Sequence, residues 1–124
     1  MSVVFDTCLL VDYLRGIPQA HAAFEAYPHR SITVITWVEV MAAAPEDLTA
    51  RTRDFLRGFE RLAINEAIAD RALSLIQRHE QITMRHALPW ATAQSNALVY
   101  VTPDFPKLSA RDATVLIPYR NTSL

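Results

Sequence analysis

Three acidic residues that are far apart in the sequence share one kind of position. Asp6 directly follows the apolar run 3–5, Asp104 follows a similar run at 98–102, and Glu39 lies one turn into the helix expected after the second strand. Because the carboxyl ends of parallel strands meet at one edge of a sheet, we expect these side chains to converge. Clustered carboxylates repel one another unless a cation neutralises them, and Mg²⁺ and Mn²⁺ prefer oxygen ligands. Such a centre activates water and stabilises charge on phosphoryl oxygens, as in nucleases and phosphatases.

Each of these acids also has a purely structural interpretation. Asp6 can cap the helix that follows it, since aspartate is a preferred N-cap. Glu39 stands three residues after Thr36, which is the spacing of a capping box. Asp104 follows Pro103 and is typical of a turn. Convergence is nevertheless the preferred hypothesis, because separate structural roles would place all three acids at one edge of the sheet only by chance.

The elements that must position these acids follow from the hydrophobic pattern. β-branched and aromatic runs predict strands, and apolar residues at helical spacing predict helices. We expect strands at 3–5, 31–35, 61–64, 98–102 and 114–117, and helices at 9–14, 18–27, 37–44, 46–60, from Asn65 onward, and at 84–97. Pro89 falls inside the last helix, which must therefore begin late or bend. The alternation predicts an α/β fold with a mainly parallel central sheet and helices on both faces.

Composition sets the limits of these interpretations. A chain of 124 residues suits a single domain, 1–124, and 51% hydrophobic content excludes a disordered chain. The formal net charge of -1 does not indicate a nucleic-acid binder, although the distribution of charge matters more than its sum. No apolar run is long enough to span a membrane, and no signal peptide is recognisable. We therefore expect a soluble, cytoplasmic protein with no membrane partner.

Several segments together resemble a known family. The run 5–16 resembles the opening motif of PIN-domain proteins, especially the VapC-type toxins of bacterial toxin–antitoxin pairs, and 31–40 resembles the second motif of that family. The segments 65–79 and 101–105 resemble its later parts, so the likeness covers nearly the whole chain in the right order.

The resemblance carries its own expectations. It implies a three-layer α/β/α fold, with Asp6, Glu39 and Asp104 as metal-binding, catalytic carboxylates of an endoribonuclease that uses Mg²⁺ or Mn²⁺. It further implies a homodimer, and an antitoxin whose tail occupies the site with a basic residue.

One position departs from the family pattern. Where the third motif usually has an aspartate, this chain has His86. Mg²⁺ strongly prefers oxygen, whereas Mn²⁺, Zn²⁺ and other transition ions accept nitrogen. His86 could therefore join the catalytic site as a ligand of a different ion, transfer protons, or bind nothing. The alternative function is a degenerate, catalytically impaired PIN domain that binds RNA or a protein. A small phosphatase or receiver-like domain is a third possibility, but Lys107 lies off the position it would need.

Other polar residues have expected roles outside the acidic centre. Asp12 should be a surface residue or a salt-bridge partner, and Asp112 a turn residue. Basic residues form two groups that either line a phosphate-binding rim or cover solvated helix faces, namely Arg51, Arg53, Arg57 and Arg61, and Arg78, His79, Arg85 and His86.

Overall fold

A five-stranded sheet forms the centre of the fold. The computed structural model describes residues 2–106 and 112–120, so Lys107 lies outside the described residues. The strand order is β3-β2-β1-β4-β5 and every neighbouring pair is parallel. The strands are β1 (Ser2–Phe5), β2 (His29–Thr33), β3 (Glu60–Leu62), β4 (Val99–Val101) and β5 (Val115–Leu116).

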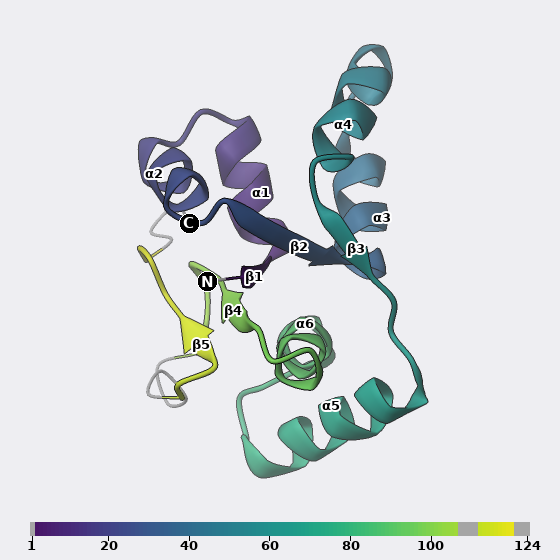
Figure 1. Ribbon diagram of the computed structural model, residues 1–124, viewed down its shortest axis with the longest axis vertical. Helices are drawn as coiled ribbons and strands as arrows, with labels where there is room; N and C mark the ends of the chain where they lie inside the picture. The colour runs from purple at the N-terminus through teal and green to yellow at the C-terminus, as the bar shows by residue number, and fades with distance from the viewer. Residues whose placement is uncertain (1, 107–111, 121–124) are drawn as a thin grey trace.

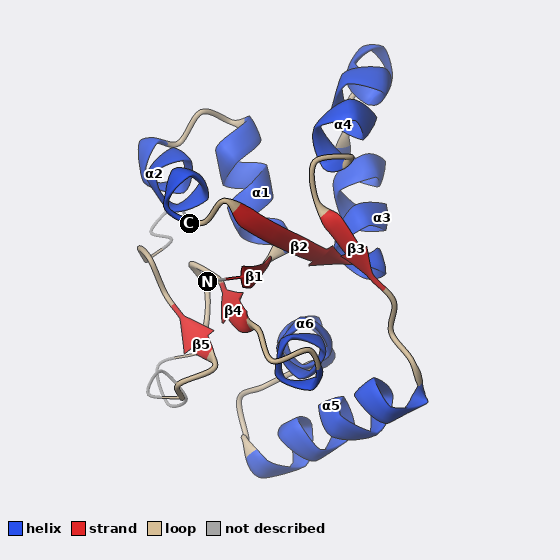
Figure 2. Ribbon diagram, in the orientation of Figure 1, coloured by secondary structure: helices blue, strands red, loops and turns tan. Residues whose placement is uncertain are grey.

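Helices cover both faces of this sheet (Figures 1 and 2). One layer holds α1 (Thr7–Leu14), α2 (Pro18–Ala26), α3 (Val34–Ala43) and α4 (Thr49–Leu56), with a 3-10 turn at Glu46–Leu48 before α4. The other layer holds α5 (Glu66–Arg78) and α6 (Met84–Ser95). The expected three-layer α/β/α fold is confirmed.

Two hydrophobic cores separate the layers, because alternate residues of each strand face opposite sides of the sheet. Val3 and Phe5 of β1 belong to the core under α1–α4. Val4, the residue between them, packs with Tyr100 and Trp90 in the core under α5 and α6. Asp6 comes next in this alternation, so its side chain lies on the face of the sheet that α6 covers.

Capping decides where two of the helices begin. The Asn65 side chain accepts a hydrogen bond from the backbone N–H of Ile68 at 2.9 Å, which confirms the predicted cap of α5. The second strand ends earlier than predicted, because Val34 and Ile35 are already helical. Thr33 caps α3 by accepting from the N–H of Thr36 at 3.1 Å. A run of β-branched residues continues across this boundary, so composition alone did not reveal it.

Three further expectations need correction. The helix predicted over 46–60 is a 3-10 turn followed by α4, and Glu60 already belongs to β3. Of the two alternatives for the helix containing Pro89, a late start is wrong, because α6 starts at Met84 with Pro89 buried inside it. Asp12 is not a surface residue: it is buried and accepts a hydrogen bond from the Tyr119 hydroxyl at 2.8 Å. No helix among the described residues is long and apolar enough to cross a membrane.

Candidate active site

Asp6 lies at the carboxyl end of the central strand. Its side chain makes no capping hydrogen bond to α1, so the capping interpretation is wrong. Its carboxylate is buried and accepts a hydrogen bond from the Thr102 hydroxyl at 2.8 Å. The same hydroxyl accepts the backbone N–H of Asp104 at 3.2 Å. Thr102 therefore fixes Asp6 and the loop that carries Asp104 relative to each other.

A guanidinium group lies against the two aspartates. Nη1 of Arg85 donates to Oδ2 of Asp104 at 2.9 Å, and its Nη2 lies 3.8 Å from Oδ2 of Asp6. Burial alone would lower the pKa of Arg85, but the charges of Asp6 and Asp104 outweigh it and the pKa is raised. Arg85 therefore remains a cation here and partly neutralises the pair.

Both ring nitrogens of His86 form hydrogen bonds. Nε2 lies 2.9 Å from Nη1 of Arg85, and Nδ1 lies 2.8 Å from the Tyr100 hydroxyl. Because a guanidinium can only donate, Nε2 must accept and the ring proton must be on Nδ1, facing Tyr100. Burial lowers the pKa of His86 and the charge of Arg85 adds to this, while Asp6 and Asp104 act in the opposite direction. A neutral ring that orients Arg85 accounts for these contacts.

Glu39 lies on α3 and shares a cavity with Asp6. Its Oε1 accepts a hydrogen bond from the Thr7 hydroxyl at 2.7 Å, and Thr7 is in turn 2.9 Å from the Thr36 hydroxyl. The capping-box interpretation of Glu39 is wrong, because Thr33 and not Thr36 caps this helix. Glu39 and Asp6 both line a cavity of about 260 Å³, whose wall also includes Arg85.

Whether these acids can hold a divalent ion depends on their chemistry, on how closely they lie and on what already contacts them. Three carboxylates are suitable donors for Mg²⁺ or Mn²⁺. Among the described residues, however, no group of three or more Asp, Glu, His or Cys side chains is gathered closely enough to hold a metal. Arg85 contacts Asp6 and Asp104, and Glu39 is bonded to Thr7. As arranged, the site fits a guanidinium and not a divalent ion.

The structure thus brings the predicted residues to one edge but not into one cluster. Asp6, Asp104 and His86 are linked through Arg85, while Glu39 shares only the cavity with Asp6. Sequence reasoning placed Arg85 in a basic group and missed its contact with the acids. The hydroxyl groups of Thr7 and Thr102 were missed too, although one directly follows Asp6 and the other ends the strand before Asp104.

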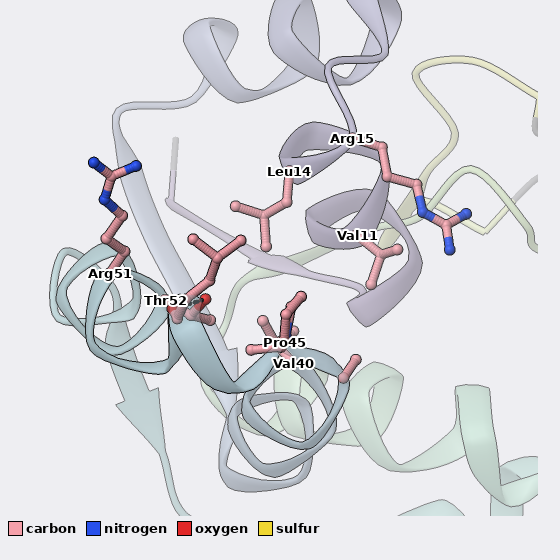
Figure 3. A pocket seen from close by; sticks show the side chains of 10 residues that line it. Val11, Leu14, Arg15, Val40, Pro45, Arg51 and Thr52 are labelled. Atoms are coloured by element: carbon pink, nitrogen blue, oxygen red, sulfur yellow. Dashed lines mark hydrogen bonds between the residues drawn. The ribbon is translucent and has the colours of Figure 1, made fainter.

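A larger and mainly apolar cavity lies away from the acids. It has a volume of about 480 Å³ and lies between α1 and the segment from α3 to α4. Figure 3 shows Val11 and Leu14 on one side of it and Val40 and Pro45 on the other, with Arg15 and Arg51 at its ends. Leu14, one of the residues that line this cavity, is 48% exposed.

Three arginines of the first predicted basic group line a third cavity, of about 230 Å³, whereas Arg51 does not. The guanidinium groups of Arg53 and Arg61 lie 5.4 and 4.7 Å from the ring centre of Trp37. Both distances are within the range of a cation–π contact. Arg57 is the third arginine, and it pairs with Asp54 at 2.8 Å. This arginine cluster is a concentration of positive charge on a chain of nearly zero net charge.

Fold and site together define an α/β protein with acidic side chains at the carboxyl edge of a parallel sheet. Comparison with known proteins agrees with this class. The family model of the PIN domain matches residues 3–105. The chain belongs to the PIN domain family, as its sequence motifs predicted.

Solved structures of other proteins share this fold. A chain of a toxin–antitoxin complex from Klebsiella pneumoniae is 35% identical, with a TM-score of 0.88 and coverage of 97% of this chain and 100% of that one. A chain of the VapBC-5 toxin–antitoxin system from Mycobacterium tuberculosis is 25% identical, with a TM-score of 0.63 and coverage of 97% and 98%. FitAcB from Neisseria gonorrhoeae shares the fold at 21% identity, with a TM-score of 0.75 and coverage of 94% and 97%. No curated protein matches the sequence at a significant level.

Proposed function

We propose that this protein is a metal-dependent endoribonuclease of PIN type, acting as the toxin of a toxin–antitoxin pair and hydrolysing RNA phosphodiester bonds. PIN-domain toxins are generally nucleases, and the similar chain from Klebsiella pneumoniae comes from a toxin–antitoxin complex. The observation that carries the proposal is that Asp6 and Glu39 line one cavity at the carboxyl edge of the sheet, with Asp104 joined to Asp6 through a shared arginine.

The site residues have distinct parts in this proposal. Asp6, Glu39 and Asp104 are the candidate ligands of Mg²⁺ or Mn²⁺, but as they lie they do not fit the ion, and their side chains and Arg85 would have to move before it could bind. A bound ion would supply Lewis acidity to water and to the phosphoryl oxygens. Thr102 and Thr7 orient Asp6 and Glu39 through their hydroxyl groups.

The arginine cluster supports RNA as the substrate. Guanidinium groups that stack on an aromatic ring keep their N–H edges free for a phosphate, and arginine matches phosphate geometry well. Arg53 and Arg61 over Trp37 therefore offer a backbone-binding surface on the same chain as the acidic centre, and Arg57, paired with Asp54, lines the same cavity. The molecule would act in the cytoplasm, where RNA is present.

The apolar cavity supports a protein partner. Its lining of Val11, Leu14 and Val40 suits an apolar segment, and Arg15 and Arg51 at its ends suit acidic residues of that segment. An antitoxin chain carrying apolar and acidic residues is the occupant we propose. A homodimer of the toxin, as the family resemblance implies, completes the assembly.

A second function has one observation in its favour. His86 stands in the third-motif position of an aspartate, and the guanidinium that it orients lies at the acids. A degenerate PIN domain that binds RNA or protein without cleaving would have such a site.

Cleavage of a structured RNA by the purified protein distinguishes the two functions. The nuclease proposal expects cleavage with Mg²⁺ or Mn²⁺, its loss with EDTA, and its loss in Asp6→Asn and Glu39→Gln. Arg71→Gln, on the exposed side of α5, is the control variant and should cleave normally. No cleavage by the wild type with any ion, together with gained cleavage in His86→Asp, would establish the degenerate function.

A further inference from the structure

We propose that Arg85 is the resident cation of the acidic site, and that a divalent ion can enter between Asp6 and Asp104 only by displacing it. This inference rests on the proposed nuclease function and adds an internal competitor to it. The competitor belongs to this chain and needs no partner protein.

Directed contacts hold the Arg85 guanidinium in one position. One terminal nitrogen, Nη1, is shared between Asp104 and His86 at 2.9 Å each, and the other faces Asp6 at 3.8 Å. His86 is itself held by Tyr100, a fully buried residue of β4. The guanidinium is therefore positioned by a neutral ring on one side and two carboxylates on the other. A side chain that merely lay over the site would lack these directed contacts.

Electrostatics make the two cations exclusive. A guanidinium cannot lose its proton under ordinary conditions, so it cannot accommodate a neighbouring ion by becoming neutral. Like charges a few ångströms apart in a partly desolvated site repel strongly. An ion ligated through Oδ2 of Asp104 would also compete for the oxygen that Nη1 now contacts. Arg85 must therefore leave before the carboxylates can close around an ion.

Arg85 is able to leave. Its side chain is 46% exposed, so it is in contact with solvent. The neighbouring Met84 is 64% exposed and lines the same cavity as Arg85. Rotation of one long side chain is sufficient, because Asp6 and the helix carrying His86 are fixed by other contacts.

The experiment is a Mn²⁺ titration of RNA-free protein, followed by calorimetry and by the electron paramagnetic resonance signal of free Mn²⁺. Arg85→Gln should bind Mn²⁺ about fivefold to tenfold more tightly than the wild type, since a half-exposed ion pair contributes on the order of 1 kcal/mol and 1.4 kcal/mol is tenfold. Arg85→Lys keeps the charge but lacks the two terminal nitrogens of the guanidinium, so its Mn²⁺ affinity should lie between those of the wild type and Arg85→Gln. Arg78→Gln removes an equal charge from the exposed end of α5 and should bind as the wild type does.

A second measurement guards against misfolding of the variants. In the wild type, the Arg85 side-chain N–H signal, assigned by its loss in Arg85→Gln, should change on addition of Mg²⁺, which is diamagnetic. Equal Mn²⁺ affinity in the wild type and Arg85→Gln, with RNA cleavage retained, would overturn this inference and leave the nuclease function intact. Absence of both Mn²⁺ binding and cleavage in the wild type and Arg85→Gln would overturn the nuclease function and this inference together.

Discussion

The hydroxyl group of Thr102 gives the sharpest test of how the acidic site is built. It donates to the buried carboxylate of Asp6 at 2.8 Å and accepts the N–H of Asp104 at 3.2 Å, and its residue has no exposed surface. Thr102→Val keeps the shape of the side chain and removes both contacts. The Asp6 charge then stays buried with one donor fewer.

The expected loss of stability follows from these contacts. A hydrogen bond to a charged group contributes about 1.5–3 kcal/mol, so Thr102→Val should lower the free energy of unfolding by about 2 kcal/mol. In a domain of this size, that corresponds to a drop of about 8 °C in the midpoint of thermal unfolding. Urea unfolding followed by circular dichroism measures the change, and Thr102→Ser, which keeps the hydroxyl, is the matched control.

A double-mutant cycle with Asp6→Asn isolates the contact. If Thr102 acts on Asp6, the two substitutions should couple by about 1–2 kcal/mol, as side chains in direct contact do. Additive effects, or a Thr102→Val protein as stable as Thr102→Ser, would refute the idea that this hydroxyl holds the carboxylate.

Three further predictions test other parts of the molecule. Tyr119→Phe removes the donor to buried Asp12 and should destabilise the fold by about 2 kcal/mol in urea. Burial and the hydrogen bond to Asp12 raise the pKa of Tyr119 in the folded protein. The stability that the protonated hydroxyl contributes is therefore complete below the unfolded pKa near 10.0 and is lost as the pH rises above it. Tyr119→Phe should make the free energy of unfolding depend less on pH in this alkaline range. Arg61→Gln should weaken RNA binding in EDTA and reduce the salt dependence by about one charge, whereas Arg71→Gln should do neither. Leu14→Asp should abolish binding of the antitoxin, tested by co-purification with the product of the neighbouring reading frame, and leave RNA cleavage unchanged.

Much of the fold could be predicted because local signals were strong. Asn65 precedes a regular amphipathic pattern, so its role as a cap could be read directly. The strand before Asp6 is a short apolar run, and the alternation of strands and helices left few topologies other than a parallel sheet. Boundaries were harder: the β-branched residues Val34 and Ile35 favour a strand, yet the Thr33 cap starts a helix there.

The contacts within the site could not be predicted in the same way. Arg85 is one of several arginines, and its role depends on Asp6 and Asp104, which come from other elements. Asp12 looked like an exposed helix residue because its partner, Tyr119, lies 107 positions away. Sequence periodicity reports which face of an element is apolar, and it carries no information on which distant polar group meets a given side chain.

The position of β1 at the centre of the sheet affects when the acidic site can form during synthesis. The ribosome makes this strand before the other strands of the sheet, but one of its two neighbours is β4, and the Thr102–Asp6 contact spans 96 positions. Pairings between such distant segments form late in folding. A nascent chain therefore lacks a finished acidic site until the segment that carries Thr102 and Asp104 has been translated.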